Sequence, residues 1–291
     1  MGNTCIRVLV ATGLLALASP AAAVDRAIYT DPPHNQAHPA RMEVLHVPSG
    51  GLAINGVGYL AAGAGIHPTL VLMHGLPGNE KNLDLAQAVR RAGWNVITFN
   101  YRGSWGSHGK FSFAGNLEDA RSVLSFIRDP ANAKKLGVDP ARIVIAGHSM
   151  GGWVTAMTAE HDPALAGVIL ICAANMGRPG QTHAETLATM ADNMETLAGV
   201  TPESMTAELE QGLKSFDWTP AAAGLARHPL LVLTSDDGLA PMDEALAQRV
   251  GGVSGAHVTT VHAATDHGWS DARIRLEDEV IRWLKQLPAG R

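Results

Sequence analysis

A serine flanked by glycines is the feature that most limits how this chain folds. Ser149 lies between Gly147 and Gly151, after the apolar, β-branched run Arg142–Ala146 and before the apolar segment Trp153–Ala159. The run predicts a buried strand and the segment predicts a helix, so the serine occupies a strand-to-helix turn. The glycines suit such a turn, because side chains beside a tightly bent serine would collide with their surroundings. The serine hydroxyl is then expected to project into the open.

Two interpretations fit this turn. Ser149 is either a nucleophile or an ordinary serine that caps the following helix. At the start of that helix, the amide of Met150 would point to the place where an oxyanion forms during attack on a carbonyl group. The strand, the helix and the partner residues described below favour the nucleophile.

With its strand and helix, the turn resembles the nucleophile elbow of the α/β-hydrolase superfamily, and the likeness covers nearly all residues after position 23. The resemblance implies an α/β fold in which a mostly parallel central sheet has helices on both faces. It also implies a small helical cap, inserted over the active site.

The order of apolar segments agrees with this expectation. From Thr69 onward, short apolar strands alternate with helices, which is typical of a parallel sheet covered on both faces. The alternation stops between residues 175 and 226, where Thr186–Leu197 and Pro202–Leu213 have helical spacing. We interpret this stretch as the cap. Its methionines either pack the cap or line a pliable acyl site; they are Met176, Met190, Met194 and Met205.

A second loop follows the apolar strand that ends at Met73. Residues His74–Asn79 contain a His-Gly-x-Pro pattern, and the resemblance implies that the amide of Leu76 joins that of Met150 in an oxyanion hole. A plain Gly-Pro turn is the alternative. His74 itself is expected to be buried and structural.

A serine nucleophile needs a base and an acid that orients the base. The resemblance selects His267, which lies between the last predicted strand and the last predicted helix. By position alone, either Asp236 or Asp237 could be the acid, since both follow a core strand. The resemblance selects Asp237, because a proline, Pro241, follows it four residues later.

The first 23 residues differ from the rest of the chain. Arg7 precedes a short apolar core, and Ala21–Ala23 supply small residues for cleavage, which is typical of a secretory signal. The apolar core is too short for a membrane anchor. We therefore expect a signal peptide at 1–23, a single α/β-hydrolase domain at 24–291 with its cap at about 175–226, and a periplasmic or secreted product.

Composition and missing motifs narrow the function further. The formal net charge is -5 and the cations are scattered, which gives no support to nucleic-acid binding. The sequence has no zinc-protease, paired-cysteine, P-loop or dinucleotide motif, so neither a cofactor nor a metal is expected. Cys172 is the only cysteine after the leader and is expected in the core. The sequence does not predict an oligomeric state.

The sequence thus predicts a secreted serine hydrolase that cleaves a small-molecule carboxylic ester through an acyl-enzyme on Ser149. A short peptide is the alternative substrate, because Tyr101–Gly103 and Asp266–Asp271 also resemble segments of serine aminopeptidases and prolyl oligopeptidases. A non-catalytic binding protein on the same fold is a third interpretation, although such proteins usually lack part of the catalytic set. Neither nucleic acid nor a stable membrane anchor is expected.

Overall fold

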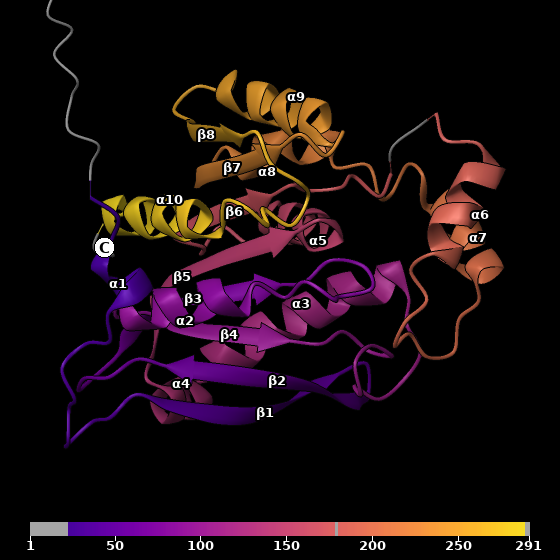
Figure 1. Cartoon of the computed structure of the whole chain (residues 1–291). Coiled ribbons are helices and arrows are strands. Elements are labelled where there is room, and N and C mark those ends of the chain that lie inside the picture. Colours follow the sequence, from indigo (N-terminus) through magenta and orange to yellow (C-terminus); the bar gives the residue numbers. More distant parts are fainter. Residues whose placement is uncertain (1–22, 178–179, 289–291) are drawn as a thin grey trace, which may run out of the picture.

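The structure is a computed structural model that describes residues 23–177 and 180–288. Eight strands form one sheet in the order β1-β2-β4-β3-β5-β6-β7-β8 (Figure 1). The strands are β1 (Arg41–Ser49), β2 (Leu52–Leu60), β3 (His67–Met73), β4 (Asn95–Phe99), β5 (Val138–His148), β6 (Gly167–Ile171), β7 (Pro229–Ser235) and β8 (His257–Ala263). The predicted signal peptide lies outside the described residues, except for Ala23.

Most neighbouring strands run parallel, as the sequence predicts. β2 is antiparallel to β1 and to β4, while the other neighbouring pairs are parallel. Gly50 and Gly51 form the turn between β1 and β2 with φ of 56° and 78°, a left-handed conformation that favours glycine. The central parallel strands are buried along most of their length, which fits their continuous apolar runs.

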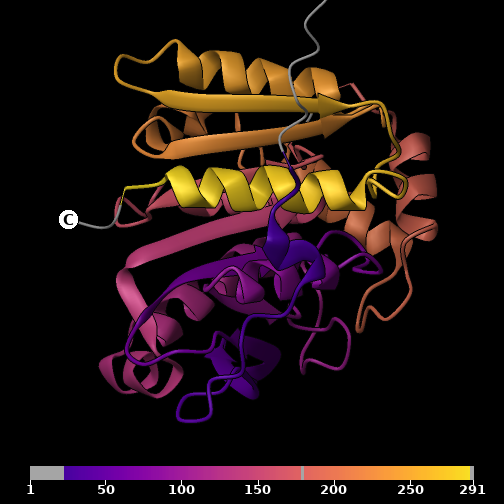
Figure 2. The same cartoon turned by 60° about the vertical axis from the view of Figure 1, so that its left-hand side comes forward.

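Helices cover both faces of the sheet, and the predicted α/β architecture is confirmed. One core lies beneath α3, α4, α5, α8 and α9, and the other beneath α1, α2 and α10. Figure 2 shows α10, in yellow, running along one face. The helices are α1 (Arg26–Tyr29), α2 (Leu83–Arg91), α3 (Phe113–Arg128), α4 (Pro130–Leu136), α5 (Met150–Ala159), α6 (His183–Ala191), α7 (Pro202–Gly212), α8 (Ala222–Leu225), α9 (Ala240–Gly251) and α10 (Arg273–Gln286), with a 3-10 turn at Thr219–Ala221.

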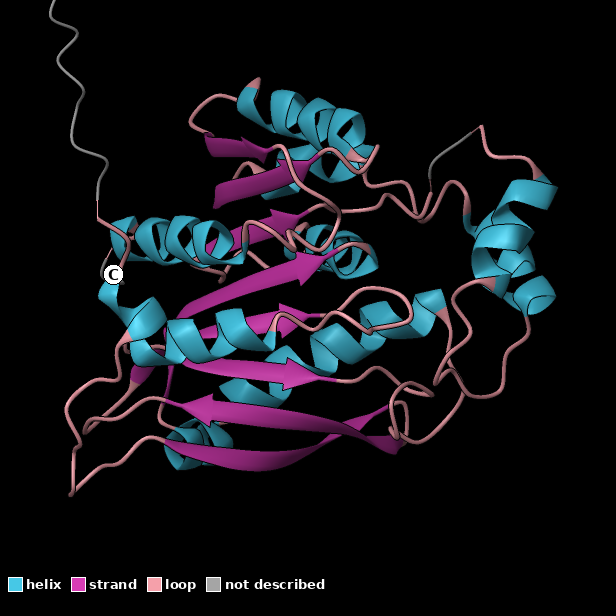
Figure 3. Ribbon diagram, in the orientation of Figure 1, coloured by secondary structure: helices cyan, strands magenta, loops and turns pink. Residues whose placement is uncertain are grey.

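The segment between β6 and β7 departs from the strand–helix alternation. Its helices α6 and α7 lie beyond the carboxyl ends of the parallel strands, to which the arrowheads point in Figure 3. The helix predicted over Thr186–Leu197 instead begins at His183, because Thr182 and Glu185 form a capping box, and it ends at Ala191. The second predicted helix agrees with α7 to within one residue. Among the described residues, no helix combines the length and the apolar character needed to cross a membrane.

Candidate active site

Ser149 stands in a strained turn between β5 and α5. Its φ is 58°, a left-handed value that is uncommon for a residue with a side chain. The amide of Ser149 donates to the carbonyl oxygen of Ile171, 3.0 Å away, which ties the turn to β6. A Cβ at Gly147 would lie 2.0 Å from the Gly151 carbonyl oxygen, and one at Gly151 would lie 2.3 Å from that of Met73. Both positions therefore require glycine.

The loop after β3 contacts Ser149. A Cβ at Gly75 would lie 2.8 Å from the Cβ of Ser149, so this loop approaches the serine as closely as glycine permits. Leu76 follows in this loop, and Met150 is the first residue of α5. Because the N–H of a first helical residue has no acceptor within its helix, that of Met150 is free of the helical ladder. Leu76 and Met150 line the same cavity as Ser149.

His74 is buried, as predicted. Its Nδ1 donates to the Gly75 carbonyl oxygen at 2.7 Å, and its ring meets that of Tyr101 edge-on at a centroid distance of 4.7 Å. Burial lowers the pKa of His74 to about 4, so the ring is neutral near pH 7. On the same loop, the Pro77 carbonyl accepts from Nε1 of Trp105 at 2.8 Å. These contacts hold the loop against the serine turn.

His267 and Asp237 form a hydrogen-bonded pair. Nδ1 of His267 lies 2.6 Å from Oδ2 of Asp237, whose other oxygen accepts from the Leu239 amide at 2.9 Å. The Asp237 side chain is 4% exposed, whereas that of His267 is 40% exposed. Burial alone would raise the pKa of Asp237, but the bonds from His267 and Leu239 outweigh it and lower the pKa below its usual value. The ionised carboxylate therefore fixes the proton of His267 on Nδ1 and leaves Nε2 as an acceptor.

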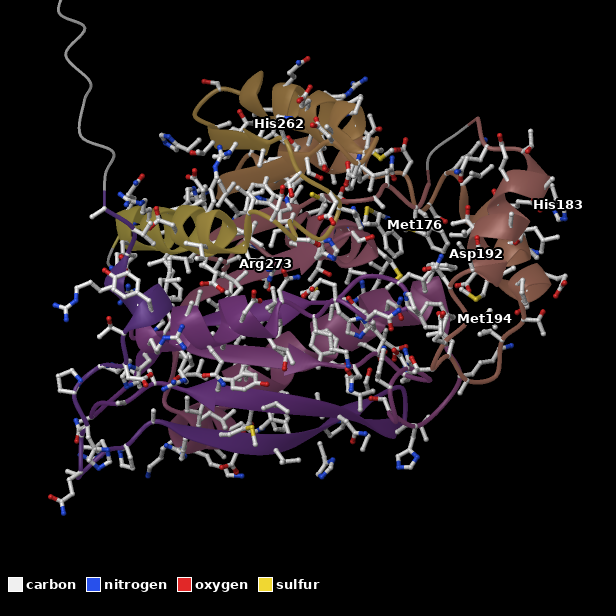
Figure 4. The ribbon with its side chains drawn as sticks, viewed as in Figure 1. Met176, His183, Asp192, Met194, His262 and Arg273 are labelled. Carbon is white, nitrogen blue, oxygen red and sulfur yellow. The ribbon has the colours of Figure 1, made fainter. Side chains whose placement is uncertain are left out.

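Asp236 lies in a different environment. Its side chain is 65% exposed, and its Oδ1 lies 3.1 Å from Nε2 of His262. Nδ1 of His262 lies 3.0 Å from the Thr234 hydroxyl, and Figure 4 shows this histidine on the β7–β8 side of the molecule. Of the two candidate aspartates, the structure joins Asp237 to His267.

A cavity of about 300 Å³ brings the predicted site residues together. Ser149, His267, Leu76 and Met150 all line it. The other lining residues come from the segment after β6 and from the region of α6 and α7; they are Ala174, Asn175, Met176, Gln181, Thr186, Thr189, Met190, Asn193, Leu209, Glu210 and Leu213. The mixture of apolar side chains with hydroxyl, amide and carboxylate groups is typical of a small-molecule site.

A family model described as the alpha/beta hydrolase family matches residues 70–279. This range begins in β3 and ends in α10, so it contains the serine turn and the loop that carries His267. The chain belongs to the alpha/beta hydrolase family.

The hydrolase is similar to three proteins of known name. It is 28% identical over 227 residues to a multifunctional-autoprocessing repeats-in-toxin of Vibrio vulnificus, and the match covers 74% of this chain and 4% of the toxin. The carboxylesterase EstE1, cloned from a metagenomic library, has a TM-score of 0.65 at 23% identity, and the match covers 86% of this chain and 91% of the esterase. An acylaminoacyl peptidase of Pyrococcus horikoshii has a TM-score of 0.64 at 16% identity, with 87% of this chain and 42% of the peptidase covered.

The family model shows the hydrolase family, and the solved structures show the fold. The hydrolase spans about half the length, or less, of the curated relatives that it matches. The two solved structures share under 25% of their residues with it, so their similarity is one of fold. The structural neighbours of the hydrolase include both esterases and a peptidase.

Contacts on both sides anchor the loop of the hydrolase that carries His267. The indole of Trp269 is fully buried, and its Nε1 donates to Sγ of Cys172 at 3.2 Å. Arg273, labelled in Figure 4, donates to the Gly268 carbonyl at 2.9 Å and to the Asp84 carboxylate at 2.8 Å. The prediction that Cys172 lies in the core is confirmed, but its contact with this loop was not predicted.

Of the four methionines expected in the cap, Met176 and Met190 line the cavity. Met194 and Met205 are not among its described lining residues. Figure 4 shows His183 on the outer side of α6, and its Nδ1 lies 2.8 Å from a carboxylate oxygen of Glu210. Glu210 lines the cavity and His183 is not among the described lining residues.

Asp243 is a buried acid that the sequence analysis missed. It lies in the first turn of α9, fully buried, and its Oδ2 accepts from the Ala173 amide at 2.9 Å. The next amide, that of Ala174, donates to the Ser149 carbonyl at 3.0 Å. Burial raises the pKa of Asp243 well above its usual value, which favours the neutral acid. Its place six residues after Asp237, at a helix start, is the only signal in the sequence.

Among the described residues, Cys172, Asp237 and His267 form a cluster whose ligand atoms lie within 4.8 Å of one another. The carboxylate and the imidazole are already bonded to each other. Burial raises the pKa of the Cys172 thiol to about 12, and a thiol must lose its proton to bind a metal ion well. A metal here would have to displace that proton and break the bond between His267 and Asp237, so the cluster is better suited to proton transfer.

Proposed function

We propose that this hydrolase cleaves carboxylic esters, with Ser149 as the nucleophile, His267 as the general base and Asp237 as the acid that orients it. The observation that carries the proposal is the shared cavity. Ser149 and His267 line it beside Leu76 and Met150, and His267 is bonded to Asp237. A nucleophile, an oriented base and two backbone amides around one space are the parts that acyl transfer requires.

These positions suit a two-step reaction. Oγ of Ser149 attacks the ester carbonyl while Nε2 of His267 accepts the hydroxyl proton. The amides of Leu76 and Met150 stabilise the charge on the carbonyl oxygen, each lowering the barrier by about 3 kcal/mol. Ionised Asp237 stabilises the imidazolium, which then protonates the leaving alcohol. Water, deprotonated by His267, attacks the acyl-enzyme, which releases the carboxylic acid and restores the Ser149 hydroxyl.

An ester is supported over a peptide by the size of the site. A cavity of about 300 Å³, walled by the region of α6 and α7, has room for the acyl chain of a small ester. More than half of the acylaminoacyl peptidase lies outside its match to this chain, which covers 42% of it. The structural likeness to that peptidase keeps a short peptide as the second candidate substrate.

Export is part of the proposal. Residues 1–23 have the basic start, apolar core and small terminal residues of a secretory signal. We therefore infer that the hydrolase acts in the periplasm or outside the cell.

A fluorophosphonate probe and a substrate panel test the proposed function. The probe should label folded wild-type protein and not Ser149→Ala, which is expected to fold because alanine fits the turn. Turnover of p-nitrophenyl esters should exceed that of aminoacyl and prolyl p-nitroanilides. Ser149→Ala should keep less than about one thousandth of the activity, because binding and the oxyanion hole alone catalyse weakly. Greater retention would overturn the assignment of Ser149, and a folded protein that no probe labels would favour a binding function.

A further inference from the structure

His148, the residue before Ser149, faces the loop of the base. It ends β5, and its side chain is 4% exposed. Its Nε2 lies 2.9 Å from the backbone carbonyl oxygen of His267. The two imidazole rings also pack together, with centroids 4.5 Å apart and planes tilted by 43°. His148 is not among the described residues that line the cavity, so it contacts the base and not the space for substrate.

The surroundings of His148 select one neutral form of its ring. Nδ1 is buried and has no hydrogen-bond partner among the described residues, so a proton there would be an unpaired buried donor. The proton therefore belongs on Nε2, from which it is donated to the carbonyl oxygen of His267. Burial and the neighbouring His267 lower the pKa of His148 to about 4, which agrees with a neutral ring near pH 7.

This bond supplies a restraint on His267 that Asp237 does not. The carboxylate of Asp237 holds Nδ1 at 2.6 Å, but this bond at one edge of the ring does not fix the backbone carbonyl of His267. The anchors at Trp269 and Arg273 hold the residues that follow His267 and do not reach that carbonyl either. The bond from His148 fixes that backbone, and the ring contact supports one face of the imidazole. Because His148 precedes Ser149 directly in the chain, the base is fastened to the turn that holds the nucleophile.

We propose that His148 is a positioning residue, which holds His267 in place relative to Ser149 through a neutral N–H bond to the loop backbone and a ring contact. The inference rests on the proposed function, in which His267 takes the proton of Ser149. A neutral ring suits the task, since a charged one would repel the imidazolium that forms during turnover.

Three variants test the proposal. His148→Gln places an amide donor near the position of Nε2, whereas His148→Phe keeps a ring and removes the donor. His228→Phe is the matched control, because His228 is also a buried histidine, 2% exposed, whose Nδ1 lies 3.1 Å from a backbone carbonyl, that of Leu165. His228 therefore reports what replacing any buried, carbonyl-bonded histidine does.

The expected result separates kcat from KM. His148→Phe should lower kcat on a p-nitrophenyl ester by about 10- to 100-fold with KM changed less than about two-fold, because misplacing a reacting group by about 1 Å costs rate more than binding. His148→Gln should keep kcat within about five-fold of wild type. His228→Phe should keep kcat within about three-fold, even if its Tm falls as much as that of His148→Phe. Wild-type kcat in His148→Phe, equal losses in the Gln and Phe variants, or an equal loss in His228→Phe would each overturn the proposal.

Hydrogen exchange measured by mass spectrometry gives a readout that needs no activity. Peptides covering residues 264–270 should exchange faster in His148→Phe than in wild type, because this variant loses the bond to the loop. The exchange rate of the same peptides should be unchanged in His228→Phe. If His148→Phe does not fold, His148→Asn takes its place, since its shorter amide does not reach the loop that the Gln amide reaches. An unlabelled, inactive wild type would refute the proposed function, while unchanged exchange in a folded His148→Phe or His148→Asn would refute the positioning role.

Discussion

Two adjacent aspartates have very different surroundings at the scale of single residues. Asp237 is 4% exposed and bonded to His267, whereas Asp236 is 65% exposed and pairs with His262. Both residues lie in the turn that follows β7, which ends at Ser235, and within this turn a shift of one position exchanges a buried partner for solvent. The same carboxylate group therefore makes a buried bond to the base at position 237 and an exposed contact at position 236.

Asp237→Asn should lower kcat by up to about 10⁴-fold and leave the fold intact. The Asn amide can hold the wrong tautomer of His267 and cannot balance the charge of the imidazolium. Asp236→Asn is the matched control and should change kcat less than about two-fold, because the exposed contact between Asp236 and His262 does not reach His267 and contributes little. Measuring kcat for both variants on one ester decides between them. A large loss of kcat in Asp236→Asn would make Asp236 the orienting acid. If neither variant loses kcat, the orienting acid is another residue.

Local patterns predict some of these residues and not others. Ser149 is marked by the glycines of its strand-to-helix turn, whereas His267 and Asp237 were selected by the family resemblance from their places after predicted strands. His148 lies 119 residues from the carbonyl that it bonds, and Asp243 lies 70 residues from the amide that it accepts from. Neither contact has a local signature, because each exists only after strands distant in sequence are brought side by side.

At the scale of helices and strands, α6 and α7 shape the cavity. α6 contributes Thr186, Thr189 and Met190, while α7 contributes Leu209 and Glu210. Both helices begin with a threonine capping box, so their first turns are fixed by their own side chains. The wall opposite the sheet is therefore built from two well-capped helices, which makes the length of the cavity sensitive to single side chains on them.

Met190→Ala should shift the preference of the enzyme toward longer acyl chains. Met190 lines the cavity and is 2% exposed, so truncating its side chain enlarges the available space. The ratio of kcat/KM for p-nitrophenyl octanoate to that for butyrate should rise by about ten-fold, since each buried methylene is worth about 0.8 kcal/mol. Met205→Ala is the matched control, because Met205 is fully buried but is not among the described lining residues.

Both methionine variants should lose stability by roughly 2–5 kcal/mol, as expected for a buried methionine replaced by alanine. Only Met190→Ala should change the ratio between the two esters. An equal change in both variants would mean that a general loosening of the helices, and not the volume beside Met190, sets the chain length.

The accuracy of the predicted elements follows the strength of their local signals. Apolar runs located the central strands of the sheet, because buried parallel strands are almost continuously hydrophobic. α4 was missed, since Pro130–Leu136 is largely polar and short. α5 begins at Met150, so it includes Gly151 and Gly152, which precede the apolar segment Trp153–Ala159 and have poor helix propensity. A Cβ at Gly151 would lie 2.3 Å from the Met73 carbonyl oxygen of β3, so close packing explains this glycine.

α10 carries a buried acid whose ionisation should weaken the fold. Glu277 is 6% exposed, and burial, together with nearby Asp84, raises its pKa to about 7. The usual pKa of glutamate in an unfolded chain is about 4.3, so the folded state binds the proton more tightly. The stability that this gives is fully present below about pH 4.3 and is lost as the pH rises through about 7.

Glu277→Gln should therefore gain stability relative to wild type as the pH rises. Between pH 5 and pH 8, the difference in the free energy of unfolding should move by about 2 kcal/mol in favour of the variant. Urea unfolding at several pH values measures it, and comparison with wild type cancels the other titrating groups. Glu279→Gln, at a partly exposed position of the same helix, should run parallel to wild type. Parallel curves for Glu277→Gln would show that this carboxyl is not held at a raised pKa.

At the scale of the whole molecule, the start of the described chain is fastened to its last helix. The amide of Asp25 donates to Oδ1 of Asp278 on α10 at 2.7 Å, and the Asp25 side chain caps α1. Arg91 of α2 donates to the Ile28 carbonyl at 2.7 Å. The chain thus makes tertiary contacts directly after the predicted cleavage site, and Arg282 of α10 also donates to the carbonyl of Ala23 just before it.

Export should remove residues 1–23 and leave the contacts of the mature domain in place. Protein recovered from the periplasm or medium of a bacterial host should begin near Val24, because Ala21–Ala23 supply the small residues that a signal peptidase needs. Removal of the leader costs the bond from Arg282 to the Ala23 carbonyl, but it should leave α1 docked because the bonds at Asp25 and Ile28 remain. Mass spectrometry of the amino terminus measures the cleavage, and Ala23→Phe, which places a bulky residue at the site, should block it. An exported protein that keeps Met1, or a product found wholly in the cytoplasm, would refute this processing.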